Sequence, residues 1–121
     1  MEDCTMEKEQ LAKILHWHQL WLEDKEGGER ADLCWVDLCE ADLRGVNLRG
    51  ADLCGANLDY SCWPLWCGSL DVTVDKRIAA QLAYHFCRVR CDDPEVQAAQ
   101  KALAPLANQF HRVEECGRIA E

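Results

Sequence analysis

The sequence predicts an α+β protein in which a short solenoid of five-residue units lies between helical segments. Residues 31–60 read ADLCW, VDLCE, ADLRG, VNLRG, ADLCG and ANLDY, with Ala or Val first, Asp or Asn second and Leu third in each unit. An amphipathic pattern precedes this repeat and further helical patterns follow it. We therefore expect three parts: a capping helix in 1–28, the repeat with an irregular last coil in 29–74, and a helical extension in 75–121.

The period of five excludes a helix for the repeat. A helix advances about 100° per residue, so a five-residue repeat drifts by about 140° per unit and its leucines would occupy every side. In an extended segment residues i and i+2 share a face, so the first and third residues of a unit point inward and the second points outward. The remaining two residues turn a corner, and such units wind into a solenoid. The predicted core of the repeat is Leu33, Leu38, Leu43, Leu48, Leu53 and Leu58.

On these six units the chain resembles the pentapeptide-repeat proteins. The resemblance implies a right-handed, quadrilateral parallel β-helix with four units to a coil and with the Leu and the small residue inside. Residues 20 apart would then stack at about the 4.8 Å spacing of neighbouring strands. This places Asp32 below Asp52 and Cys34 below Cys54. Six units make only about one and a half coils, so the flanking segments are expected to cap the stack.

The first flank, 6–23, is predicted to be an amphipathic helix that caps the open first coil. Its apolar stripe has helical spacing and consists of Leu11, Ile14, Leu15, His18, Trp21 and Leu22. Gly27 and Gly28 close the segment. After Tyr60 the repeat decays into an irregular coil, and 71–74 alternates as a short strand does.

The C-terminal part is predicted to be helical. Asp75 is the expected N-cap of a helix over 76–90, and Asp93 caps a third helix that has Pro94 at its first position. That helix carries apolar residues up to Val113, and Pro105 should kink or split it near Lys101. These segments resemble the C-terminal extension of short pentapeptide-repeat proteins encoded in Firmicutes genomes and their prophages. This resemblance implies that the protein is phage-related.

Composition narrows the class of protein. The net charge is −9, and residues 1–30 and 31–60 each contribute −4. Such a surface repels nucleic acid and attracts basic partners, or it only keeps the protein soluble. The N-terminus is too acidic and polar for a signal peptide, and no run is long enough to span a membrane. We expect a cytoplasmic protein whose nine cysteines stay reduced.

The sequence contains none of three common motifs of catalytic or phosphate-binding sites: a phosphate-binding loop, a zinc-protease motif and a nucleophile elbow. Asp32 and Asp52 stack on one outer wall and are not expected to form a catalytic pair. One group of Cys and His residues has a spacing that fits a zinc site only approximately. A zinc site at these residues is an alternative to buried, free thiols. No cofactor is expected. The zinc set comprises Cys62, Cys67, His85, Cys87 and Cys91.

The leading functional hypothesis is a non-enzymatic protein-binding module, because a solenoid offers flat walls and no cleft. The resembled family includes acidic mimics of DNA that occupy the DNA-binding saddle of gyrase, which implies an inhibitor of a nucleic-acid-binding enzyme. Two alternatives stay open: a scaffold that dimerises through the C-terminal helices, and a zinc-binding protein. The expected partner is a protein with a basic surface, with no direct binding of nucleic acid or membrane. The candidate partner-binding residues are Asp32, Asp37, Glu40, Asp42, Asp52 and Asp59.

Overall fold

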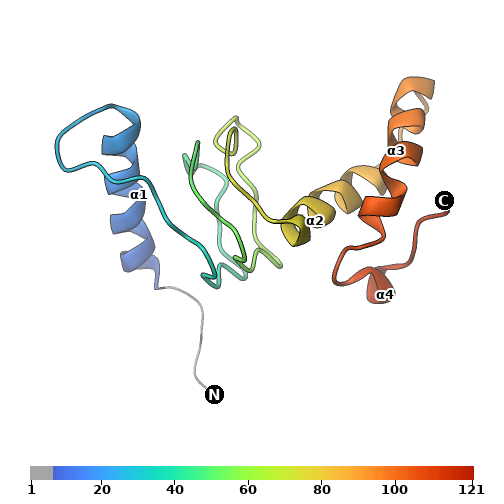
Figure 1. Cartoon of the computed structure of the whole chain (residues 1–121), viewed down its shortest axis with the longest axis horizontal. Coiled ribbons are helices and arrows are strands. Elements are labelled where there is room, and N and C mark those ends of the chain that lie inside the picture. Colours follow the sequence, from blue (N-terminus) through green and yellow to red (C-terminus); the bar gives the residue numbers. More distant parts are fainter. Residues whose placement is uncertain (1–6) are drawn as a thin grey trace, which may run out of the picture. The chain divides into compact units, whose positions relative to one another are not determined.

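The computed structural model describes residues 7–121, and the chain divides into two compact units, Met1–Val74 and Asp75–Glu121. The first holds helix α1 (Lys8–Leu22) and the repeat, and the second holds α2 (Lys76–Cys87), α3 (Pro94–Ala107) and α4 (Val113–Cys116) (Figure 1). The predicted division of the first unit after residue 28 stays a prediction.

The predicted right-handed β-helix is wrong. Within residues 7–121 no β-strand and no sheet form, and the regular secondary structure is helical. The repeat contributes only isolated parallel bridges, which pair Asp32 with Asp52, Asp37 with Asn57, Asp42 with Cys62 and Asp52 with Thr73. The physical reason is the length of the unit: one residue pairs with the neighbouring turn, and the chain then bends at the next corner. The ladder therefore never extends to the several consecutive residues that make a strand.

The turns of the repeat nevertheless stack with the expected offset of 20 residues. Beside the bridge between Asp32 and Asp52, the backbone N–H of Leu33 donates to the Asp52 carbonyl at 2.8 Å. The six leucines of the repeat point inward, and each is at most 7% exposed. Five of them are at most 1% exposed, so this row is the apolar core of the first unit.

The register changes by one residue in the second turn. Leu43 N–H donates to the Cys62 carbonyl, 19 residues further on, whereas Leu48 N–H donates to the Gly68 carbonyl, 20 residues further on. One extra residue is therefore inserted between these two contacts. Leu65 and Leu70 are consequently not core residues, since they are 86% and 54% exposed. The predicted strand 71–74 is reduced to a single bridge at Thr73.

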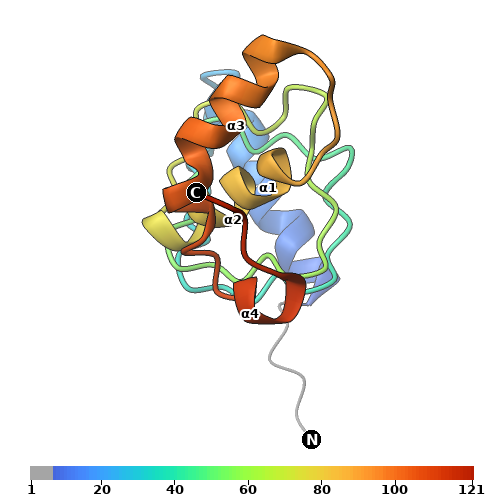
Figure 2. The same cartoon turned by 90° about the vertical axis from the view of Figure 1, so that its right-hand side faces the viewer.

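Helix α1 lies across one open end of the stacked turns, as both Figure 1 and Figure 2 show. It ends within a residue of its predicted end and buries His18 fully. The Ala31 N–H donates to His18 Nδ1 at 2.9 Å, so the neutral ring carries its proton on Nε2, which lies 2.8 Å from the Arg49 carbonyl. Trp21 stacks on His18 and covers Gly50. The buried imidazole of α1 thus bonds to both the first and the fourth unit of the repeat, and the capping role of residues 1–28 stays a prediction.

Helices α2 and α3 start directly after their predicted capping residues. Asp75 accepts a hydrogen bond from Ile78 N–H at 2.9 Å, and Asp93 accepts from Glu95 N–H at 2.8 Å at the start of α3. The predicted third helix is too long, because α3 ends at Ala107 and continues past Pro105. The break falls after Pro105, not near Lys101. Helix α2 also ends earlier than predicted, at Cys87.

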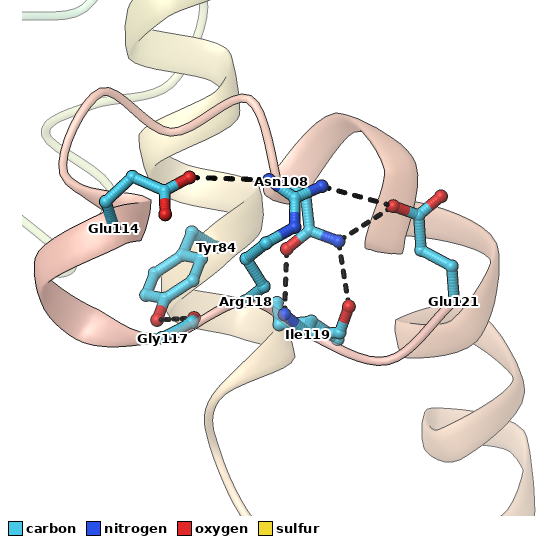
Figure 3. Close-up of polar contacts among 7 residues, drawn as sticks. All are labelled: Tyr84, Asn108, Glu114, Gly117, Arg118, Ile119 and Glu121. Carbon is cyan, nitrogen blue, oxygen red and sulfur yellow. Dashed lines mark hydrogen bonds and ion pairs between the residues drawn. The ribbon is translucent and has the colours of Figure 1, made fainter.

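A small core joins the helices of the second unit. It contains Ala83, Tyr84, Ala107, Phe110 and Val113, and the Tyr84 and Phe110 rings lie 4.8 Å apart. The chain after α4 is held against this core by Asn108 (Figure 3). Asn108 Nδ2 donates to the Ile119 carbonyl and Asn108 Oδ1 accepts from the Ile119 N–H, each at 2.8 Å. Tyr84 donates its hydroxyl hydrogen to the Gly117 carbonyl.

Candidate functional site

The second residue of each unit has a local role on the outer surface of the repeat. In each of the six units its side-chain oxygen accepts a hydrogen bond from the backbone N–H two residues on, at 3.0 to 3.2 Å. These are Asx turns, which Asp and Asn form equally well. Of the predicted partner-binding residues, Asp32, Glu40 and Asp42 are exposed, whereas Asp37, Asp52 and Asp59 are half-buried.

Asp42 is paired with a neighbouring base. Arg44 binds it through two nitrogens, at 2.7 and 2.8 Å. The side-chain hydrogen bonds from Arg44 lower the pKa of Asp42 to about 2. Both side chains are largely exposed, so the pair adds little to stability. It does reduce the charge that Asp42 can offer to a partner.

Asp32, Cys34 and Asp52 form the one group of three possible metal-binding side chains found among residues 7–121. Their ligand atoms lie within 4.8 Å of one another. Hydrogen bonding of the thiol to the two carboxylates raises the pKa of Cys34 to about 12. The thiol is therefore protonated at neutral pH and is a poor nucleophile. The two aspartates are stacked on one outer wall, as their parallel bridge shows.

The predicted zinc set is divided between the two units. Cys62 and Cys67 belong to the first unit, and His85, Cys87 and Cys91 belong to the second. None of these five residues takes part in the metal-compatible group found in the described chain. The Cys87 thiol lies 3.4 Å from the Gln100 carbonyl, and burial raises its pKa. Both effects favour a thiol over the thiolate that zinc requires.

One wall of the repeat combines carboxylates with exposed aromatic rings. We call residues 36–40 and 56–60 the acidic wall. It carries Asp37, Glu40 and Asp59, and its ten residues include no Lys or Arg. Trp35 stands at the corner before the wall, and Tyr60 is the last residue of the wall; these side chains are 83% and 69% exposed.

The corners of this wall adopt a backbone conformation that favours glycine. Trp35, Glu40 and Tyr60 have φ of 66°, 64° and 62°, while Gly50 and Gly55 occupy equivalent corners with φ of 74° and 77°. A side chain in the left-handed region costs about 1 kcal/mol or more. The Trp35 ring also fills the space beside Gly55, where a Cβ atom would collide with it. The sequence pattern contained this signal, because the fifth residue is Gly in three units and bulky in the other three.

A groove adjoins the acidic wall on the side of α1. Its volume is about 630 Å³, within the range of pockets that bind ligands or side chains. Leu38, Cys39 and Glu40 of the wall form part of its lining, so the groove and the wall are continuous. The remaining lining residues are Lys8, Leu11, Ala12, Leu15, Ala41, Asp42 and Val46.

Comparison with known proteins identifies the repeat. Residues 29–62 match the family described as Pentapeptide repeats, in eight copies. This segment therefore consists of pentapeptide repeats, a family that indicates a protein-interaction module in general and is generally non-enzymatic. No curated protein and no solved structure matches the chain. Among residues 7–121 no helix is long and apolar enough to cross a membrane.

Proposed function

We propose that the protein is a non-enzymatic binding module whose first unit binds a basic surface of a partner protein. Its charge distribution is the observation that carries the proposal. The sequence up to Val74 has 15 acidic and six basic residues, whereas Asp75–Glu121 has seven of each. The entire net charge of −9 thus belongs to the unit that contains the repeat. A field concentrated in this way steers and orients a basic partner.

We propose further that the partner is a nucleic-acid-binding enzyme and that the acidic first unit competes with nucleic acid for its basic groove. Two stacked turns span about 10 Å at the spacing between strands. Duplex DNA carries about one charge per 1.7 Å, so this height corresponds to about six phosphates. The first unit would therefore occupy only a short part of a groove that binds duplex DNA.

The test is affinity capture with the full-length protein from a nuclease-treated lysate of the native host, followed by mass spectrometry. The purified partner is then titrated with the protein at low and at moderate salt, and in the presence of duplex DNA. We expect affinity to fall several-fold with salt and DNA to displace the protein. A partner whose affinity is unchanged by salt contradicts the proposal, and a partner that DNA leaves bound contradicts the competition alone.

A second candidate function is self-association through the second unit. Helix α2 exposes Leu82 and Phe86, and Val89 follows shortly after its end; these side chains are 39%, 36% and 53% exposed. Leu103 of α3 is 37% exposed. Apolar side chains repeated along a helix often mark an interface. Analytical ultracentrifugation of the wild type and of Phe86→Glu tests this candidate, which requires a dimer that the substitution dissociates.

A further inference from the structure

We propose that His18 is a proton-operated latch: its neutral ring holds α1 against the first turn of the repeat, and uptake of a second proton by the ring releases the helix while the repeat stays folded. This inference goes beyond the proposed function and does not depend on it. Three features carry it: the burial of His18, the hydrogen bonds of its two ring nitrogens, and the sparse packing of the rest of α1.

The two hydrogen bonds of His18 require a neutral ring. Its Nδ1 lies 2.9 Å from the backbone nitrogen of Ala31, which carries a hydrogen and can only donate. The ring therefore presents a lone pair at Nδ1, and the hydrogen on Nε2 is directed at the Arg49 carbonyl, 2.8 Å away. An imidazolium carries a hydrogen on both nitrogens. Protonation would thus set the N–H groups of His18 and Ala31 against each other.

The surroundings of His18 also disfavour a charged ring. The residue is 0% exposed, so an imidazolium would lose its hydration. On the side of α1 the neutral indole of Trp21 stacks on the ring. On the side of the repeat Arg30 repels a second cation, and Arg49 offers its carbonyl while its guanidinium lies over the Trp66 ring. Burial lowers the pKa of His18 most, the bond to the Arg49 carbonyl raises it, and Arg30 lowers it further.

The rest of α1 is packed sparsely against the repeat. Of the 15 residues of this helix, all of which the structure describes, only His18 is buried. Leu11 and Leu15 are half-buried and line the groove of about 630 Å³ between α1 and the repeat. The side-chain contact of Gln19 with Asn47 is exposed and 3.4 Å long. The attachment of α1 therefore depends strongly on the hydrogen bonds of one ring.

Release of the latch would open the end of the repeat across which α1 lies. An isolated helix of 15 residues is marginal in water, so α1 should lose its own hydrogen bonds when it detaches. Trp21 would leave Gly50, which its ring now covers, and the Ala31 amide would meet water. The groove would disappear with the helix, because α1 forms one of its sides. The latch thus couples proton uptake to the presence of the groove.

The first experiment measures hydrogen exchange of the full-length protein by NMR at pH 7.5 and at pH 5.5. A solvated imidazole titrates near pH 6.5, so the fraction of molecules with α1 released should rise about tenfold between these conditions. We expect the protection factor of the Ala31 amide to fall by about the same factor. The Leu53 amide, which donates to the Thr73 carbonyl within the stack, should stay at least tenfold better protected than Ala31 at pH 5.5. Equal protection of the two amides at pH 5.5 would overturn the proposal, because α1 would then be released only when the whole unit unfolds.

The second experiment assigns the titration to His18. Its variant His18→Gln retains one acceptor and one donor group in the side chain but has no proton to take up in this range. We expect the protection of the Ala31 amide in this variant to change less than twofold between pH 7.5 and pH 5.5. The matched control His16→Gln, at an exposed position of the same helix, should keep the tenfold change. A tenfold change that persists in His18→Gln would reject His18 as the latch.

A third measurement uses the wild type alone and needs no variant to fold. Long-range proton–nitrogen NMR spectra distinguish a protonated ring nitrogen from an unprotonated one. At pH 7.5 we expect the hydrogen of the His18 ring on Nε2 and none on Nδ1. On acidification the ring should take up its second proton together with the loss of protection at Ala31. A hydrogen on Nδ1 at pH 7.5, or a ring that becomes charged while Ala31 stays protected, would overturn the proposal.

Discussion

His18 Nδ1 accepts a hydrogen bond from the backbone N–H of Ala31 at 2.9 Å, which joins α1 to the first residue of the repeat. Within the stack, backbone groups of one turn bond to the next turn, as Asp52 N–H does to the Ala31 carbonyl. The first turn has no turn before it, so its inward amide needs another acceptor. The imidazole supplies that acceptor, and its second nitrogen lies against the Arg49 carbonyl.

Stability of the first unit should therefore decrease in mild acid. Burial lowers the pKa of His18 below its ordinary value near 6.5, because the charged ring loses its hydration. Below pH about 6.5 the unfolded chain binds a proton that the folded state takes up only at lower pH. The free energy of unfolding should fall by up to about 1.4 kcal/mol per pH unit in this range. Urea denaturation at pH 7.5 and at pH 5.5 measures the effect.

All five tryptophans precede Val74, so their fluorescence follows the unfolding of the first unit. His18→Gln should be less stable at pH 7.5 and should lose part of the pH dependence. The matched control is His16→Gln, at an exposed position on the same helix, which should behave as the wild type does. A pH dependence that persists unchanged in His18→Gln would assign it to other groups.

Truncation of a repeat leucine should destabilise the first unit strongly. Leu43 is 0% exposed, and Leu→Ala at such sites costs about 2 to 5 kcal/mol. We expect the midpoint of urea denaturation, followed by tryptophan fluorescence, to fall accordingly in Leu43→Ala. Leu65→Ala is the matched control because Leu65 is 86% exposed, and its midpoint should stay within about 0.5 kcal/mol of the wild type. Similar losses in both variants would contradict the inward orientation of the repeat.

Several features of the fold could be predicted because they follow from local chemistry. The period of five fixes which residues point inward, and the Asp–Pro pair at 93–94 marks the start of α3. The absence of strands could not be predicted from this period. The alternation of inward and outward residues within a unit is the same whether one residue forms a β-bridge or several consecutive residues form a strand. The end of α3 was missed because Phe110 and Val113 continue the helical spacing after Ala107, although they reach the core from a turn and from α4.

The candidate site was predicted only in part. The sequence shows the carboxylates of the repeat, but it does not show which side chains bind them. Arg44 binds Asp42, and the Cys34 thiol forms hydrogen bonds with Asp32 and Asp52. Trp35 was overlooked because one exposed indole has no periodic pattern. The size and position of the insertion that exposes Leu65 could not be predicted from the sequence either, because a register change of one residue depends on packing around the whole turn.

The N-cap of α3 offers a test confined to the second unit. Asp93 accepts hydrogen bonds from Glu95 N–H at 2.8 Å and from Val96 N–H at 3.2 Å. Asp93→Ala leaves both amides without this acceptor and should cost about 1 kcal/mol. The neighbouring Asp92→Ala changes the charge equally and removes no cap, so its cost should be within about 0.5 kcal/mol. Far-ultraviolet circular dichroism during thermal denaturation compares them, and equal melting temperatures would exclude a capping role.

The segment after α4 should detach when its amide partner is removed. Asn108 is 6% exposed and makes two hydrogen bonds to the backbone of Ile119 and one to the Glu121 carboxylate at 2.9 Å. Asn108→Ala removes all three, so the Ile119 amide should exchange its hydrogen at least tenfold faster, as measured by NMR. Glu121→Gln keeps a side-chain acceptor and leaves the two backbone bonds intact, so exchange at Ile119 should change less than threefold. Unchanged protection of Ile119 in Asn108→Ala would show that apolar packing of Ile119 against the core, and not the amide, holds this segment in place.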